Sequence, residues 1–141
     1  MAEPLDAIDP EEIVLRRVHL QYYKPNAPVR IDRGAFKPTP SDVDGISLYR
    51  ASRVSAQQVQ GERGKPENYA VVRLSARAVL ALGVRLSPAE RPDDPLPGHM
   101  VIPELNCTEY LRDKTHLKEL TRKLAEIANG EDVLPPATPP A

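Results

Sequence analysis

The chain has 141 residues, of which 40% are hydrophobic and 28% charged, and its formal net charge at pH 7 is −1. This composition is typical of a globular domain, and it excludes a disordered chain and a protein that holds nucleic acid by bulk positive charge alone. A single cysteine, Cys107, excludes an intrachain disulfide and a zinc site built from cysteines.

The sequence also bears on where in the cell the protein is expected. No apolar run approaches the ~20 residues that a membrane-spanning helix needs, and no basic and then apolar leader opens the chain. Arginines outnumber lysines 13 to 6, a bias that suggests a GC-rich bacterial genome. We therefore expect a cytoplasmic protein of bacterial type that has no membrane partner.

The two ends of the chain differ from its middle. Residues 1–10 contain two prolines, three acidic residues and no base, which predicts a flexible acidic lead-in. Residues 131–141 contain four prolines, which favour polyproline II over a helix or an inner strand and predict a flexible tail. A single globular domain is thus expected over residues 11–130.

The sequence of the first half of this domain predicts two strands. Residues 13–23 are rich in β-branched and aromatic residues, and from Arg16 onward the apolar side chains of Val18, Leu20 and Tyr22 alternate with those of Arg17, His19, Gln21 and Tyr23. Residues 29–44 predict a loop with Phe36 as its apolar anchor. Residues 45–51 predict the second strand, with Ile46 and Leu48 on one face and Ser47 and Tyr49 on the other.

The second half alternates short strands with helices. Residues 54–60 predict a short helix, residues 69–74 a third strand, and residues 76–82 a helix that Ser75 caps. Residues 84–86 and 99–105 predict two further strands on either side of a proline-rich loop, and Pro103 favours an edge position for the last one.

Residues 108–129 predict the longest helix. Its apolar stripe consists of Leu117, Leu120, Leu124 and Ile127. The connection over residues 75–83 is too short for a parallel crossover. We therefore expect an α+β fold with a mainly antiparallel sheet of about five short strands, a short helix, and the long C-terminal helix packed on one face.

Common catalytic and cofactor motifs are absent from the sequence. There is no glycine-rich phosphate loop, no Gly-x-Ser-x-Gly nucleophile elbow and no complete calcium loop. His19, His99 and His116 are too far apart in sequence to predict a zinc site, and Cys107 has no neighbouring cation that would activate it. We expect no metal and no cofactor.

One set of polar residues could form a site. Arg17, His19 and Gln21 share a face of the first predicted strand, Ser47 and Tyr49 share a face of the second, and His99 opens a later strand. If these faces coincide, two imidazoles could act as base and acid while Arg17 anchors a phosphate. Such a set suits a metal-independent, toxin-like ribonuclease, or the binding of a phosphorylated ligand without chemistry. The alternative is an ordinary polar strand face in contact with water.

Charge is distributed unevenly along the chain. Residues 51–91 carry seven bases and three acids, whereas residues 92–141 carry five bases and nine acids. Arg50, Arg53, Arg63 and Lys65 flank a predicted loop and could contact nucleic acid. The two segments could equally pack side by side and cancel their charges.

These observations favour a function without catalysis. A neutral net charge with separated patches, the absence of catalytic motifs and a proline-rich tail predict a small accessory protein that docks on a larger protein partner. The predicted binding residues are Gln21, Ser47, Tyr49, Arg50 and Arg53, and the ribonuclease alternative assigns catalysis to His19, His99 and Arg17. Nucleic-acid binding through residues 51–91 is the second alternative.

Overall fold

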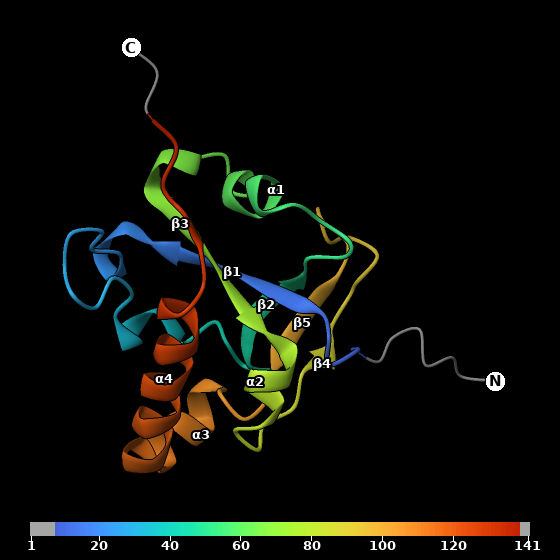
Figure 1. Ribbon diagram of the computed structural model, residues 1–141. Coiled ribbons are helices and arrows are strands. Elements are labelled where there is room, and N and C mark those ends of the chain that lie inside the picture. The colour runs from blue at the N-terminus through green and yellow to red at the C-terminus, as the bar shows by residue number, and fades with distance from the viewer. Residues whose placement is uncertain (1–7, 139–141) are drawn as a thin grey trace.

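Six strands form one sheet in the computed structural model, which describes residues 8–138. They are β1 (Ile13–His19), β2 (Ile46–Arg50), β3 (Tyr69–Ser75), β4 (Ser87–Pro88), β5 (His99–Ile102) and β6 (Val133–Leu134). Within the described residues the strand order is β4-β5-β2-β1-β3-β6, and every neighbouring pair is antiparallel (Figure 1). The predicted α+β class with an antiparallel sheet is confirmed, with one strand more than expected.

Four helices accompany the sheet within residues 8–138. They are α1 (Ala56–Gly61), α2 (Ala76–Leu80), α3 (Cys107–Arg112) and α4 (Lys114–Asn129). Ser55 and Ser75 act as N-caps of α1 and α2, because each hydroxyl accepts a hydrogen bond from the backbone N–H three residues later. The single helix predicted over residues 108–129 was wrong at one point: Asp113, with φ −135° and ψ 58°, leaves the helical region and separates α3 from α4.

The larger core lies between α4 and one face of the sheet. The strands contribute Val14, Val18, Ile46, Leu48, Val72, Leu74, Met100 and Ile102, all of them buried. Leu117, Leu120 and Leu124 of α4 pack against this surface, which confirms that the C-terminal helix covers one face. Phe36, the predicted loop anchor, is fully buried in the same core.

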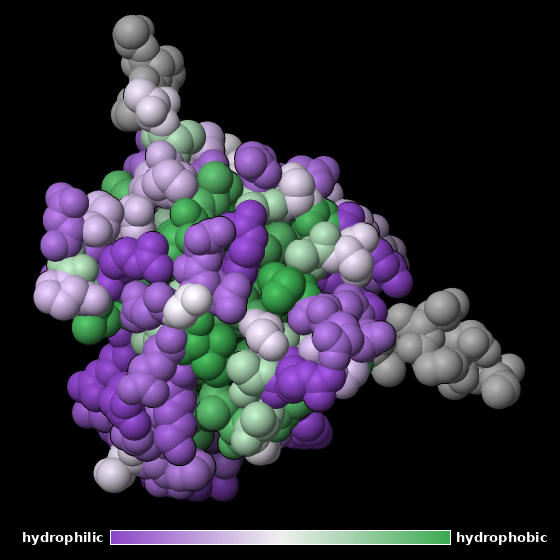
Figure 2. Space-filling model, viewed as in Figure 1, coloured by the Kyte–Doolittle hydropathy of each residue, from purple (hydrophilic) through white to green (hydrophobic). Residues whose placement is uncertain are grey.

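A smaller apolar cluster lies on the opposite face, beneath α1. It consists of Leu15, Tyr49, Val54, Ala56, Val59 and Val71. Figure 1 shows α1 above the strands and α4 below them, and Figure 2 shows apolar side chains in the middle of the same view, bordered by the hydrophilic surface of α4. On the α1 side of the sheet His19 is exposed, and Arg17, Ser47 and His99 are only half-buried.

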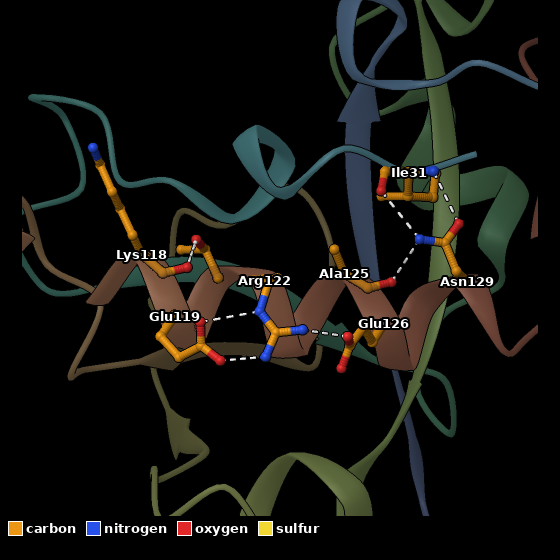
Figure 3. A network of polar contacts seen from close by, with 8 residues as sticks. Ile31, Lys118, Glu119, Arg122, Ala125, Glu126 and Asn129 are labelled. Carbon is orange, nitrogen blue, oxygen red and sulfur yellow. Dashed lines mark hydrogen bonds and ion pairs between the residues drawn. The ribbon is translucent and has the colours of Figure 1, made fainter. Parts of the chain in front are cut away.

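The long segment between β1 and β2 is held against the helix layer. Asn129 of α4 accepts a hydrogen bond from the Ile31 N–H at 2.9 Å and donates one to the Ile31 carbonyl at 3.1 Å (Figure 3). The segment enters β2 through Gly45, whose φ is 126°. A Cβ atom there would lie 2.3 Å from the Ile102 carbonyl oxygen, so this position requires glycine.

Several strand boundaries differ from the prediction. The first strand ends at His19 rather than Tyr23, because residues 20–22 form a 3-10 turn in which the His19 imidazole accepts a hydrogen bond from the Gln21 N–H at 3.1 Å. Leu20, predicted to share a face with Val18, is exposed, whereas Val18 is buried. The strand predicted over residues 84–86 was also wrong, since β4 forms at residues 87–88, and the strand predicted over residues 99–105 ends at Ile102.

Parts of both predicted termini, residues 1–7 and 139–141, lie outside the described residues. From the predicted lead-in, Ile8 packs against the larger core. From the predicted tail, residues 133–134 form β6 beside β3, and the Gln60 side chain donates to the Pro135 carbonyl at 2.8 Å. Within residues 8–138 no helix is long and apolar enough to cross a membrane.

Candidate anion-binding cleft between two strands

β1 and β2 are neighbours in the sheet but pair over only a short stretch. Their ladder ends at the pair of Leu15 with Tyr49, whereas β1 pairs with β3 at all seven of its residues. The Arg16 side chain spans the space beyond the ladder: its Nε donates to the Ala35 carbonyl at 2.8 Å and its Nη1 to the Ser47 carbonyl at 2.7 Å. The guanidinium thus takes the place of ladder hydrogen bonds where the two strands separate.

Arg16 is a half-buried cation on the apolar face of β1. Its guanidinium lies 5.7 Å from the centre of the Phe36 ring. Burial lowers the pKa of Arg16 to about 10, and the nearby Asp42 carboxylate acts in the opposite direction. Arg16 therefore stays charged at neutral pH.

A cleft of about 320 Å³ opens beside this separation. Four cationic side chains and one carboxylate line it, namely Arg16, Arg17, Lys37, Arg63 and Asp42. The lining also includes the hydroxyl-bearing residues Tyr22, Thr39, Ser41, Ser47 and Tyr69. Within residues 8–138 neither Lys37 nor Arg63 has an ion-pair partner, so the cleft holds an excess of positive charge.

Four of the eight predicted site residues line this cleft: Arg17, His19, Gln21 and Ser47. Arg17 forms an ion pair with Glu62, and its guanidinium lies 5.1 Å from the centre of the Tyr69 ring. The His19 ring meets the same Tyr69 ring edge to face, with 5.7 Å between centroids. Tyr69 of β3 thus fixes both side chains from the neighbouring strand.

His99 and Tyr49 lie beside the cleft and contact it through Ser47. The Nε2 atom of His99 lies 3.0 Å from Ser47 Oγ, and its Nδ1 lies 3.1 Å from the Ala89 carbonyl oxygen. The carboxylate of Asp94 is 3.6 Å from the same Nδ1. The Tyr49 ring lies next to the imidazole, with 5.3 Å between centroids. Burial raises the pKa of the Tyr49 phenol above its ordinary value of 10.

The two histidines share one face of the sheet but are not neighbours. His99 pairs with Tyr49, Tyr49 pairs with Leu15, and His19 lies four residues further along β1. A rise of about 3.3 Å per residue and a spacing of about 4.8 Å between strands put the two backbones about 16 Å apart. An acid and a base that act on one scissile bond must both reach it, so this separation argues against the pair of His19 and His99.

Arg50 and Arg53, which were also predicted to bind a ligand, lie outside the cleft. Arg50 donates from Nε and Nη2 to the two carboxylate oxygens of Glu12, at 3.0 and 2.6 Å. Hydrogen bonding from Arg50 lowers the pKa of Glu12 to about 2. Arg53 makes a longer ion pair with Glu90, at 3.7 Å. In the described structure both arginines connect segments of the chain.

Sequence reasoning missed two of the cations in the cleft, Arg16 and Lys37, and named the third, Arg63, only as a contact for nucleic acid. One signal for Arg16 was present, because alternation puts it on the same face as the buried Val14 and Val18, and a charge on an apolar strand face marks a polar centre. Lys37 and Arg63 come from segments far apart in the sequence. No local pattern indicates that these two side chains line one cleft.

Metal binding receives no support from the described residues. Within residues 8–138 no group of three or more His, Cys, Asp or Glu side chains could hold a metal ion. His116 is exposed on α4, and Cys107 is a half-buried free thiol whose Sγ lies 3.9 Å from the Pro40 carbonyl oxygen. The lining of the cleft itself supplies cations, hydroxyl groups, the Asp42 carboxylate and the His19 imidazole.

This set of groups fits an anion with several acceptor oxygens. No protein-family model, no curated protein and no solved structure matches the chain. The roles of the cleft residues are therefore argued from their geometry and charge.

Proposed function

We propose that this chain is a binding protein that docks on a larger protein partner by holding a phosphorylated side chain of that partner in the cleft between β1 and β2. The observation that supports the proposal best is the charge of the cleft, where four cations and one carboxylate lie in the lining and Glu62 pairs with Arg17, so that positive charge remains in excess. Binding of this kind needs no bond to form or break, in keeping with an accessory role.

The chemistry of a phosphoryl group matches the lining of the cleft. Such a group carries a charge of roughly −1.5 to −2 at pH 7 and three strong acceptor oxygens. Arginine binds such oxygens in a fork, and lysine acts as a mobile point charge. The hydroxyls of Thr39 and Ser41, 2.9 Å apart, lie in the same lining. A volume of about 320 Å³ is at the small end of ligand sites, which favours one side chain over a long polymer.

The two alternative functions receive less support from the geometry. Four of the seven bases in residues 51–91, the segment considered for nucleic-acid binding, form ion pairs: Arg53, Arg77, Arg85 and Arg91. A nucleic-acid surface gathers its bases unpaired along one groove. The ribonuclease alternative requires His19 and His99 to act on one phosphodiester, and the register of the strands separates them.

Titration of the full chain with phosphoserine peptides and their unphosphorylated forms tests the proposal. We expect binding only of the phosphorylated forms, with an affinity that falls as salt is added. Lys37→Ala and Arg63→Ala should each weaken binding about tenfold or more, because each removes a charge-assisted contact worth about 1.5–3 kcal/mol. Lys65→Ala is the matched control, since Lys65 is exposed and does not line the cleft.

Equal affinity for the two forms of the peptides, or an equal loss in the Lys65→Ala variant, would contradict the proposal. Tight binding of RNA in place of the peptides would support the nucleic-acid alternative. Cleavage of RNA without added metal, abolished in both His19→Ala and His99→Ala while thermal stability is retained, would support the ribonuclease alternative.

A further inference from the structure

We infer that Ser47 is an activated nucleophile, that His99 is its general base, and that Ser47 can accept an acyl group from a carboxylic ester bound in the cleft. Ser47 Oγ lies 3.0 Å from His99 Nε2. On the other side of the ring, Nδ1 faces the Ala89 carbonyl at 3.1 Å and the Asp94 carboxylate at 3.6 Å. A hydroxyl, an imidazole and a carboxylate in this order form the arrangement that activates serine in acyl transfer.

The contacts of His99 define where its proton lies. The carbonyl oxygen of Ala89 can only accept a hydrogen bond, so Nδ1 must be the protonated nitrogen. In the neutral ring Nε2 then carries a lone pair, and the hydroxyl of Ser47 must donate to it. This direction of the hydrogen bond is the one that proton transfer from serine to histidine requires.

Two paired strands hold the serine and the histidine in place. Tyr49 of β2 pairs with His99 of β5, and Ser47 lies two residues before Tyr49, so Ser47 and His99 are diagonal neighbours on one face. His99 follows Gly98, whose φ is 82°. A Cβ atom at Gly98 would lie 2.8 Å from the Arg53 side chain, so glycine lets the chain pass close to this residue.

Asp94 is itself oriented toward the imidazole. Its Oδ2 accepts a hydrogen bond from the Arg91 N–H at 2.7 Å, and the same oxygen faces His99 Nδ1. When His99 takes the proton of Ser47, the resulting imidazolium faces this carboxylate and the Ala89 carbonyl. The side chains of His99 and Asp94 are only 15% and 21% exposed, so water screens their attraction weakly.

The cleft gives a substrate access to Ser47 and supplies positive charge for the reaction. Ser47 lines the cleft together with the cations already described. Arg17 and Ser47 both line this cleft, on the two strands that separate after the pair of Leu15 with Tyr49. This cationic lining stabilises the oxyanion that forms at an attacked carbonyl, the task that an oxyanion hole performs. The substrate class that fits is an ester with an anionic substituent.

In the acylation step, Ser47 Oγ forms a bond to the ester carbonyl carbon, and its proton passes to His99 Nε2. The bond from that carbon to the alcohol oxygen then breaks, and His99 gives the proton to the departing alcohol. Water attacks the acyl-serine by the same route, which releases the carboxylic acid and restores Ser47. The ester and water are the only reactants that the sequence of steps consumes.

A neutral organophosphorus reagent separates this activity from phosphate recognition. The full chain is treated with diisopropyl fluorophosphate, and the adduct is located by peptide mass spectrometry. The hydroxyl of Ser47 displaces fluoride from phosphorus, and the adduct therefore adds one diisopropylphosphoryl group to the chain. We expect one adduct per chain, on Ser47, and none in Ser47→Ala. The inference goes beyond the proposed binding function and does not depend on it.

The rate of labelling distinguishes an activated serine from a merely accessible one. His99→Gln should slow labelling by about 10²-fold or more, the usual contribution of a general base. His116→Gln, an exposed histidine on α4, should label at the wild-type rate. No adduct on Ser47 in the folded wild-type chain, or unchanged labelling in His99→Gln, would overturn the inference. If Ser47 is labelled but the same protein does not bind phosphopeptides, the proposed binding function is rejected and the inference about Ser47 stands.

Discussion

Asn129, the last residue of α4, connects this helix to a residue 98 positions earlier in the chain. Its amide exchanges two hydrogen bonds with the backbone of Ile31 and donates a further one to the Ala125 carbonyl at 2.9 Å (Figure 3). Ile31 is fully buried, so its backbone groups have no water to replace these bonds. One side chain thus anchors the segment that forms a wall of the cleft.

Replacing Asn129 by aspartate should lower the free energy of unfolding by about 2 kcal/mol or more, because the change removes two donors and puts a carboxylate against two carbonyl oxygens. Urea denaturation at neutral pH measures this. Lys118→Ala, an exposed change on the same helix, should stay within about 0.5 kcal/mol of the wild type. Equal stability of the two variants would show that the Asn129 amide does not anchor this segment.

The ion pair of Glu12 with Arg50 makes stability depend on pH in a defined window. The pKa of Glu12 falls from its ordinary value of 4.5 to about 2 in the folded chain, chiefly through hydrogen bonding from Arg50. A carboxylate with a depressed pKa stabilises the fold above its unfolded pKa, and this contribution is lost as pH falls toward the folded pKa. Glu12 therefore supports the fold fully above about pH 5.

The stability difference between the wild type and Glu12→Gln should be largest near pH 7 and should shrink between pH 4.5 and 2. Thermal unfolding of both proteins across this range measures the difference, and the subtraction removes the titration of other acids. Glu11→Gln is the control, because Glu11 belongs to an ion pair with Arg77 that is largely exposed. A difference that stays constant down to pH 2 would contradict the assignment.

At the scale of elements, alternation predicted where strands lie better than where they end. In residues 13–23 the pattern correctly put Val18 and Arg17 on opposite faces of the strand, but it continued past His19. The reason is a local hydrogen bond from the Gln21 N–H to the His19 side chain, which competes with the hydrogen bonds between strands. Such a bond does not change the pattern of apolar and polar residues, so the sequence pattern cannot predict it. Asp113 is a second case, because helix-forming residues flank it on both sides.

The cap of α1 was predictable from sequence and can be tested alone. The Ser55 hydroxyl accepts from the Gln58 N–H at 3.1 Å, and the Gln58 side chain accepts from the Ser55 N–H at 2.8 Å. Ser55→Ala should therefore cost about 1 kcal/mol in free energy of unfolding. Gln57→Ala, an exposed change within the same helix, should be nearly neutral in the same denaturation assay. Similar effects of both changes would mean that the capping box adds nothing.

At the scale of the whole molecule, the order of the strands decides which side chains meet. Sequence could group Arg17 with His19, and Ser47 with Tyr49, by the face that each strand presents. It could not show that β1 and β2 separate after Leu15, since that depends on how the 34–42 segment packs. The cleft therefore emerges only from the tertiary arrangement, and half of the predicted site residues lie in it.

The Gln60 side chain holds the last described segment of the chain against the edge of the sheet. This buried side chain donates to the Tyr69 carbonyl at 2.9 Å and to the Pro135 carbonyl at 2.8 Å. Gln60→Leu should release residues 133–137, and their amide protons should exchange with deuterium about tenfold faster, equivalent to about 1.4 kcal/mol. Gln57→Leu should leave their exchange unchanged. Unaltered exchange in both variants would show that β6 is held by other contacts.

The charge of Arg16 has a consequence for the phosphate binding that we propose for the cleft. With a pKa of about 10, this guanidinium is cationic throughout the range in which cells operate. The second proton of a phosphate monoester, by contrast, leaves near pH 6. For the phosphorylated side chain proposed above, the charge of Arg16 is therefore constant while the charge of the ligand changes with pH. A dianion is attracted more strongly than a monoanion, so the proposed binding should weaken on acidification because the phosphate is protonated and not because Arg16 changes.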